Sequence, residues 1–177
     1  MSLEKAYYII DRVPEFPYFL FASYYVFTTP VSTSRHVFSI AFIYMLVSLL
    51  LGLGIKHILK TERPRPYGDV KPFCFDIPSI HTSLSLGAVA FTYFVNPVYS
   101  ILMFPVGVLY FYSRLKLGYH TKKAILVGAL IGVVTGIGCG MLLADLYFTE
   151  RVESYLSVLF FSIPPIASVL RAWRASR

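Results

Sequence analysis

Two candidate histidines, His81 and His120, lie among cationic and hydroxyl side chains within three short, ordered segments of the 177-residue chain, KHILKTERP, PSIHTS and SRLKLGYH. Guanidinium and ammonium groups bind phosphate oxygens, and histidine can serve as a nucleophile or as a general acid. These residue types together favour phosphoryl transfer that requires no metal ion. The candidate residues, in segment order, are Lys56 and Arg63, then Ser79 and His81, then Ser113, Arg114 and His120.

The spacing within the segments indicates how the side chains are presented. Lys56 and Arg63 are seven residues apart, about two helical turns, so we expect both on one helix face, with Pro64 ending that helix. Ser113 and His120 repeat the spacing. The HExxH, Walker-type GxxxxGK[ST] and GxSxG patterns are absent from the sequence, which removes the common alternatives for a metal, nucleotide or serine-nucleophile site.

The second segment is typical of a helix start, because Pro78 is followed by the small hydroxyl residue Ser79. The backbone N–H groups of residues 79–81 would then face an incoming anion. Each of these features alone has an ordinary explanation, since a base at the end of a membrane span usually reaches toward the headgroups. We assign that ordinary role to Lys60, Arg65, Lys71, Lys116, Lys122 and Lys123, and a role as polar anchors to His36 and His57.

Composition places the chain among membrane proteins, as one domain over residues 1–177. It is 56% hydrophobic and only 14% charged, which is too apolar for a soluble domain of this length. The net charge of +7 is not gathered in a basic tail, so we expect no nucleic-acid partner. Cys74 and Cys139 are far apart and lack metal-type spacing, so neither a metal nor another cofactor is expected.

Windows without Asp, Glu, Lys or Arg set the predicted spans. The window 82–113 exceeds the roughly 20 residues that one span needs, and Asn96–Pro97 is a natural break within it. A chain in lipid must satisfy its backbone hydrogen bonds internally, and alternating strand patterns are absent, so we predict an all-α bundle of about six transmembrane helices. The predicted spans are 16–34, 37–55, 79–95, 98–113, 124–144 and 154–170.

With six spans, the loops 60–78 and 114–123 lie on one side of the membrane. All but two of the 16 Lys and Arg residues belong to that side, the exceptions being Arg35 and Arg151. By the positive-inside rule we expect a multi-pass protein of the cell membrane whose active-site face is cytoplasmic.

A glycine occurs at every fourth position of the fifth span. Such a ladder gives a smooth helix face that another backbone can approach closely. It can form a homodimer seam or a close contact inside the bundle, and the second reading is the more common one. The glycines are Gly128, Gly132, Gly136 and Gly140.

The three segments in this order resemble the signature of the type 2 phosphatidic acid phosphatase superfamily, Lys-x6-Arg-Pro, Pro-Ser-Gly-His and Ser-Arg-x5-His-x3-Asp. The resemblance covers residues 56–124 directly. It implies that His120 is the nucleophile that forms a phosphohistidine, and that His81 protonates the leaving group and later activates water. Phosphate oxygens would be held by Lys56, Arg63, Ser79 and Arg114, with Ser113 beside them, and no metal is implied.

Two positions depart from the signature. Ile80 replaces its glycine, so the isoleucine side chain must point away from the ligand. Ala124 replaces the aspartate that, in the family, orients the nucleophilic imidazole. One explanation is that another acid supplies this carboxylate: Asp69 and Asp76 lie on the other loop, and Glu62 adjoins Arg63. The other explanation is that the site binds lipid phosphate without turnover.

The sequence therefore predicts a metal-independent membrane hydrolase acting on a lipid phosphate or diphosphate. A polyprenyl diphosphate, a phosphatidate-like lipid and a glycerophosphate lipid all fit as substrates. The alternative is a catalytically impaired relative that binds or transports phospholipid without turnover. A purely structural membrane subunit is a third class, but it leaves Lys56, Arg63 and Arg114 unexplained.

Overall fold

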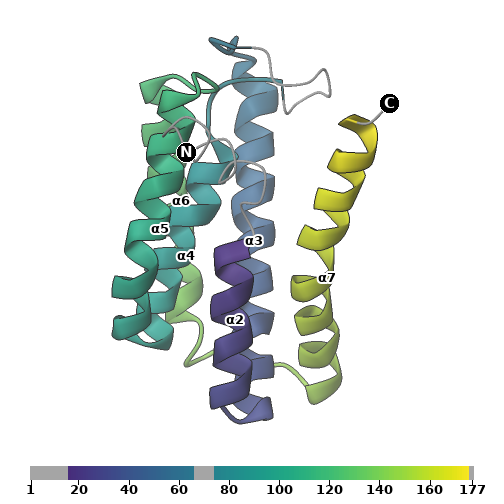
Figure 1. Cartoon of the computed structure of the whole chain (residues 1–177). Coiled ribbons are helices and arrows are strands. Elements are labelled where there is room, and N and C mark those ends of the chain that lie inside the picture. The colour runs from purple at the N-terminus through teal and green to yellow at the C-terminus, as the bar shows by residue number, and fades with distance from the viewer. Residues whose placement is uncertain (1–15, 66–73, 176–177) are drawn as a thin grey trace, which may run out of the picture.

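The structure, a computed structural model, describes residues 16–65 and 74–175. Within these residues it contains six helices and no strand, so the predicted all-α fold class is confirmed. Consecutive helices run in opposite directions along one bundle (Figure 1). They are α2 (Phe16–Thr28), α3 (Val31–Leu59), α4 (Ile80–Val95), α5 (Pro97–Lys116), α6 (Lys122–Met141) and α7 (Glu150–Ala175).

Three of these helices, α3, α5 and α6, are long and apolar enough to cross a membrane, and this is compatible with a membrane protein. Helix α4 is apolar but has 16 residues, and α2 has 13. About 20 residues are needed for an untilted span, so the predicted count of six spans is not confirmed by helix length. Large apolar side chains are exposed along the outside of the bundle, among them Ile101, Leu102 and Phe104 on α5 and Leu126, Leu130 and Val134 on α6.

The predicted break between the third and fourth segments is confirmed. Helix α4 ends at Val95 and α5 begins at Pro97. Asn96 lies between them with an extended backbone, and its side-chain oxygen accepts a hydrogen bond from Val98 N at 2.9 Å. Proline suits the first helical position because its missing N–H would have no partner there.

The expected continuation of α3 to Arg63 is wrong. The helix ends at Leu59, and Lys60 adopts the left-handed conformation with φ 47°, its N–H still bonded to the carbonyl of Lys56 at 3.0 Å. A residue in this conformation turns the chain away from the helix axis. Lys56 therefore lies in the last turn of α3, whereas Arg63 belongs to the connection that follows.

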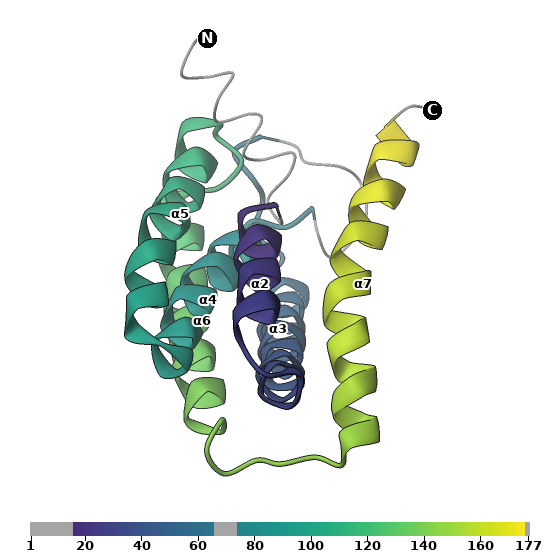
Figure 2. The same ribbon diagram turned by 60° about the horizontal axis from the view of Figure 1, so that its bottom comes forward.

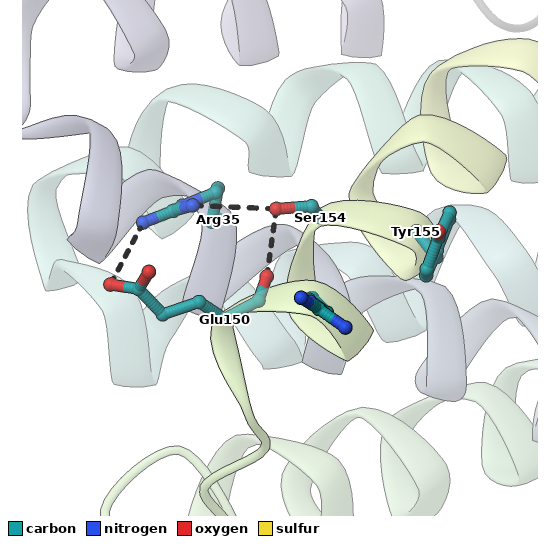
Figure 3. Close-up of a pocket in the computed structure, with 5 residues that line it drawn as sticks. Arg35, Glu150, Ser154 and Tyr155 are labelled. Atoms are coloured by element: carbon teal, nitrogen blue, oxygen red, sulfur yellow. Dashed lines mark hydrogen bonds and ion pairs between the residues drawn. The ribbon is translucent and has the colours of Figure 1, made fainter.

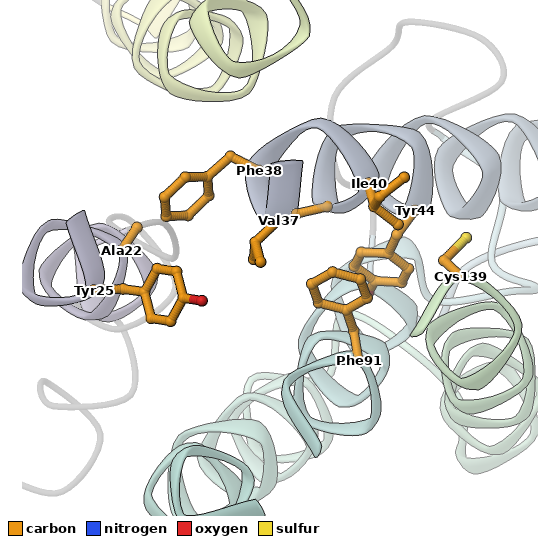
Figure 4. Packing of buried hydrophobic residues seen from close by; sticks show 9 residues of the cluster. Ala22, Tyr25, Val37, Phe38, Ile40, Tyr44, Phe91 and Cys139 are labelled. Atoms are coloured by element: carbon orange, nitrogen blue, oxygen red, sulfur yellow. The ribbon is translucent and has the colours of Figure 1, made fainter. Parts of the chain in front are cut away.

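Helix α3 is central and contributes most residues of the buried hydrophobic cluster. Val37, Phe38, Ile40 and Tyr44 project from it toward Ala22 and Tyr25 of α2, Phe91 of α4 and Cys139 of α6 (Figure 4). The rings of Tyr25 and Phe38 meet edge to face with centroids 5.9 Å apart, a favourable aromatic geometry. This cluster fixes α2, α4 and α6 around the helix that carries Lys56.

The glycine ladder of α6 lies against α4. A Cβ at Gly128, Gly132 or Gly136 would come within 2.4 Å of a backbone oxygen of α4 or of Ser79, which precedes it, and a Cβ at Gly140 would strike the Phe94 ring. Only glycine permits this approach. Since α4 occupies this face, the ladder makes a contact inside the bundle, and we do not propose a homodimer through it.

The described ends of the two predicted site loops meet at one end of the bundle. The end of α3, the start of α4, the end of α5 and the start of α6 all lie there, together with the end of α7 (Figure 1). The connection from α6 to α7 crosses the opposite end (Figure 2). The packing of α4 against α6 therefore determines how the second and third sequence segments face each other.

Candidate active site

His120 and Asp76 form a buried pair at this end of the bundle. The distance from His120 Nδ1 to Asp76 Oδ1 is 2.7 Å, and the two side chains are 1% and 2% exposed. A carboxylate only accepts hydrogen bonds, so Nδ1 carries the proton. Nε2 then keeps its lone pair, which is the form a nucleophilic imidazole needs.

Thr121 holds the other side of the same carboxylate. Its hydroxyl donates to Asp76 Oδ2 at 2.6 Å, and its N–H lies 3.3 Å from Oδ1 and 3.4 Å from Oδ2. The Thr121 hydroxyl oxygen also accepts a hydrogen bond from Ala124 N at 3.2 Å, which caps α6. Burial of a charged group is tolerated when it accepts several hydrogen bonds, and Asp76 has this environment.

Two cations brace the segment that carries Asp76. Lys56, 1% exposed, donates from Nζ to the carbonyls of Phe75 and Asp76, the second at 3.0 Å. Arg63 donates from Nε to the carbonyl of Phe75 at 3.0 Å and from its guanidinium to the carbonyl of Tyr119 at 3.4 Å. Although Arg63 lies outside the helix, its side chain therefore meets Lys56 at the same carbonyl.

Ser79 is the residue before α4, as the sequence predicts for a helix start. Its N–H donates to the carbonyl of Ala124 at 2.9 Å, and its hydroxyl oxygen accepts from Thr82 at 3.0 Å. The expectation that the N–H groups of 79–81 all face an anion is therefore wrong for Ser79, because this N–H ties α4 to the first turn of α6. A helix N-terminus keeps further N–H groups in its first turn.

His81 lies in that first turn of α4 and is half-buried. Its helix starts beside the start of α6, because Ser79 and Ala124 are hydrogen-bonded across the two helices. His120 directly precedes the cap of α6. The two histidines thus belong to adjoining helix starts.

Arg114 and Ser113 lie near the end of α5 and are both completely buried. The Ser113 hydroxyl donates to the carbonyl of Tyr110 within its own helix at 2.9 Å. The guanidinium carbon of Arg114 lies 5.7 Å from the centre of the Tyr119 ring, and that of Arg65 lies 5.5 Å from the same ring. Tyr119, next to the nucleophile candidate, thereby gathers cationic side chains through its ring.

The environment of His120 lowers its pKa. Burial is the largest cause, and the positive charge of Arg63 is the next, while the hydrogen bond to Asp76 acts in the opposite direction. Lys56 adds a smaller lowering effect. The pKa of His120 therefore lies well below the ordinary value of about 6.5, and the ring is neutral at neutral pH.

The isoleucine that replaces the signature glycine packs against α3. Ile80 is 7% exposed, and a Cβ built on Gly52 would lie 3.1 Å from Ile80 Cγ1. The side chain of Ile80 is thus directed to a place where α3 has no side chain. Gly52 of α3 therefore leaves room for the isoleucine side chain that stands where the family signature has a glycine.

Asp69, one of the two acids considered as the orienting carboxylate, lies outside the described residues. Glu62 is described and exposed. Asp76 is the acid that contacts His120 in the described part of the chain.

A second polar cluster lies at the opposite end of the bundle. Arg35 donates to Ser154 Oγ at 3.3 Å and pairs with Glu150 at 3.5 Å, and together with Arg151 and Tyr155 these residues line an open pocket (Figure 3). None of the residues predicted to act in catalysis lines this pocket.

No family model, curated protein or solved structure matches the chain. The likeness to the phosphatase superfamily therefore depends on the three sequence segments. Their described residues meet at one end of the bundle, through the hydrogen bonds given above.

Two residues of this site were missed by the sequence reasoning, Thr121 and Tyr119. Threonine before an apolar helix is a normal cap signal, so the position of Thr121 at the start of α6 could be found in the sequence. Its contact with Asp76, 45 residues earlier, could not. Tyr119 carries no comparable local signal.

Proposed function

We propose that the protein is an integral membrane phosphatase that removes phosphate from a lipid phosphate or diphosphate through a phosphohistidine on His120. The observation that carries this proposal is the hydrogen bond between His120 Nδ1 and Asp76. An imidazole fixed in this tautomer presents Nε2 as a nucleophile. Asp76 would thereby take the place of the carboxylate that is missing at Ala124.

Cations around the pair support an anionic substrate. Lys56, Arg63 and Arg114 lie within the same end of the bundle, and two of them meet at the carbonyl of Phe75. A bound phosphate would offer the N–H groups of these side chains charged oxygens, which form stronger hydrogen bonds than neutral carbonyls do. Charge that develops on the phosphoryl oxygens would be stabilised where it forms.

In the first step Nε2 of His120 attacks phosphorus and the bond from phosphorus to the lipid oxygen breaks. The leaving oxygen takes the electron pair and receives a proton from His81. In the second step His81 removes a proton from water, the water oxygen attacks phosphorus, and the P–N bond breaks. The net reaction consumes one water and yields the lipid alcohol, or the lipid monophosphate from a diphosphate, and inorganic phosphate.

The membrane setting is part of the proposal. Three long apolar helices and an apolar outer surface suit a substrate that enters from the bilayer. The bases in the described residues are concentrated at the active-site end, which favours a cytoplasmic placement. Orientation is tested by labelling intact cells with an impermeant reagent, using Cys74→Ser and a new cysteine at Glu62, and labelling would contradict this placement.

The proposal is tested by phosphate release from a panel of lipid phosphates and diphosphates presented in mixed micelles. Wild type should release phosphate, whereas His120→Ala should not. Acid-labile, base-stable phosphorylation of the wild type, absent from His120→Ala, would identify the covalent intermediate. Release no faster than the His120→Ala background for every lipid would overturn the enzymatic proposal.

The second candidate function is a lipid-phosphate binder without turnover. It is favoured by the departure at Ala124 and by the burial of the His120 side chain, which is only 1% exposed. Binding of the same lipids by wild type and by His120→Ala with equal affinity, without phosphate release, is the expected result for that function.

A further inference from the structure

Thr121 binds the Asp76 carboxylate on the side opposite to His120. Oδ2 accepts the Thr121 hydroxyl at 2.6 Å, while Oδ1 accepts His120 Nδ1 at 2.7 Å. The Thr121 N–H adds longer contacts of 3.3 and 3.4 Å to the two oxygens. Two consecutive residues thus hold the two oxygens of one carboxylate.

Asp76 needs this second contact because it lies on a connection and not on a helix. Lys56 fixes its carbonyl, but the side chain can still rotate about its own bonds. If the carboxylate turned, Nδ1 of His120 would lose its acceptor. The imidazole could then carry its proton on Nε2, where the lone pair is required.

We propose that Thr121 is a positioning residue: its hydroxyl holds the Asp76 carboxylate so that Nδ1 of His120 stays protonated and Nε2 stays free to react. The catalytic consequence depends on the function proposed above. The tautomer itself does not, because it can be measured in a protein without turnover.

A purely structural role competes with this proposal, because the Thr121 hydroxyl oxygen also caps α6 by accepting from Ala124 N. Loss of a cap lowers helix stability but has no effect on which nitrogen of a neighbouring imidazole carries the proton. The two roles therefore differ in their effect on the His120 tautomer and in their coupling to Asp76.

The test compares Thr121→Val with Thr121→Ser in the full chain in detergent micelles. Thr135→Val serves as the matched control, because Thr135 also lies on the α6 segment, and its buried hydroxyl bonds Ser48 at 2.7 Å within the bundle. Nitrogen-15 spectra of histidine-labelled protein, with His120→Gln for assignment, report the tautomer. Phosphate release gives kcat and KM for the same variants.

In Thr121→Val, His120 should populate the Nε2–H tautomer as well as the Nδ1–H tautomer. Its kcat should fall by roughly 10- to 100-fold, the range expected for one hydrogen bond to a charged group, with KM little changed. Thr121→Ser should keep the wild-type tautomer and most of kcat. Thr135→Val should affect thermal stability alone. In an Asp76→Asn background, Thr121→Val should add little further loss, because the carboxylate on which it acts is gone.

An unchanged tautomer in Thr121→Val would overturn the proposal, and so would fully multiplicative losses in the double variant. If wild type releases no phosphate but Thr121→Val alters the His120 tautomer and Thr121→Ser does not, the phosphatase proposal fails and the positioning role of Thr121 stands.

Discussion

Replacement of Asp76 by asparagine tests the site most directly, because it keeps the shape of the side chain and removes its charge. The carboxylate accepts from His120 Nδ1 at 2.7 Å and from the Thr121 hydroxyl at 2.6 Å. An asparagine cannot serve both partners in the same way. Its single oxygen faces either the imidazole or the threonine.

If the amide oxygen faces His120, the amide NH2 faces the Thr121 N–H and hydroxyl. The hydroxyl then has to accept instead of donate, and a hydrogen bond to a charged acceptor is lost, which costs about 1.5–3 kcal/mol. If the amide NH2 faces His120, Nδ1 must accept and the proton moves to Nε2, which removes the nucleophilic lone pair. Both arrangements also lose the negative charge that stabilises the imidazole as it becomes cationic.

The combined loss is about 3–5 kcal/mol in the barrier, or roughly 10²- to 10⁴-fold in kcat. The aspartate of a serine triad, when replaced in the same way, causes a loss of about 10⁴-fold. The measurement is kcat and KM for phosphate release in micelles. Glu62→Gln is the matched control, since it removes one exposed carboxylate from the same end of the bundle.

KM should change little in Asp76→Asn, and inhibition by a phosphate analogue such as vanadate should persist, because the cations remain. A kcat of Asp76→Asn within about threefold of wild type, an energy difference of less than 1 kcal/mol, would refute the orienting role. An equal loss in Glu62→Gln would refute it too, since the effect would then reflect net charge near the site.

Gly128→Ala should lower the free energy of unfolding by about 1–3 kcal/mol and should also lower kcat, because the new Cβ would collide with the Ser79 carbonyl oxygen. Gly138→Ala is the control: a Cβ there has no atom within 4 Å, so thermal unfolding and phosphate release should stay close to wild type. Because the Arg63 charge lowers the pKa of His120, Arg63→Gln should move the acid limb of the kcat/KM profile to higher pH, and an unmoved limb would contradict this cause. Wild-type activity should survive dialysis against a chelator, and a loss restored by divalent metal would contradict the metal-free mechanism.

The helical segments could be predicted from the sequence because their signals are local. The Asn96–Pro97 break lies at a helix boundary in the structure, but the predicted break at residues 35 and 36 is wrong. Both residues lie inside α3, which begins at Val31 after Pro30, because Arg35 and His36 are accommodated within the helix by pairing with Glu150 and Glu153 of α7. The end of α3 was predicted too late. Pro64 is an evident stop signal in the sequence, but the helix already ends at Lys60, which adopts a left-handed conformation that a lysine rarely takes and that its residue type does not predict. The break at Asn96–Pro97 was therefore predicted, whereas the break at Pro30 and the turn at Lys60 were missed.

The site could be predicted only as far as residue types and spacing allow. Asp76 was one of two candidate acids, because sequence places both on the correct loop without giving distances. The contact of Thr121 with Asp76 joins residues 45 positions apart, and the bracing of Phe75 by Lys56 and Arg63 uses a backbone carbonyl. Neither leaves a periodic pattern, because each arises only when the helices pack.

The packing of α4 against α6 explains why a carboxylate can come from Asp76 when position 124 holds alanine. Ala124 is completely buried, and its carbonyl accepts the Ser79 N–H that joins the two helices. A carboxylate at position 124 would be buried next to this contact and would need hydrogen-bond donors from the protein. Together with Asp76, it would also place two negative charges near one imidazole. Asp76 instead enters from a connection whose carbonyls are held by Lys56 and Arg63, and its oxygens are satisfied by His120 and Thr121. The small residue at position 124 thus allows the close packing of α4 against α6, while Asp76 holds the imidazole of His120.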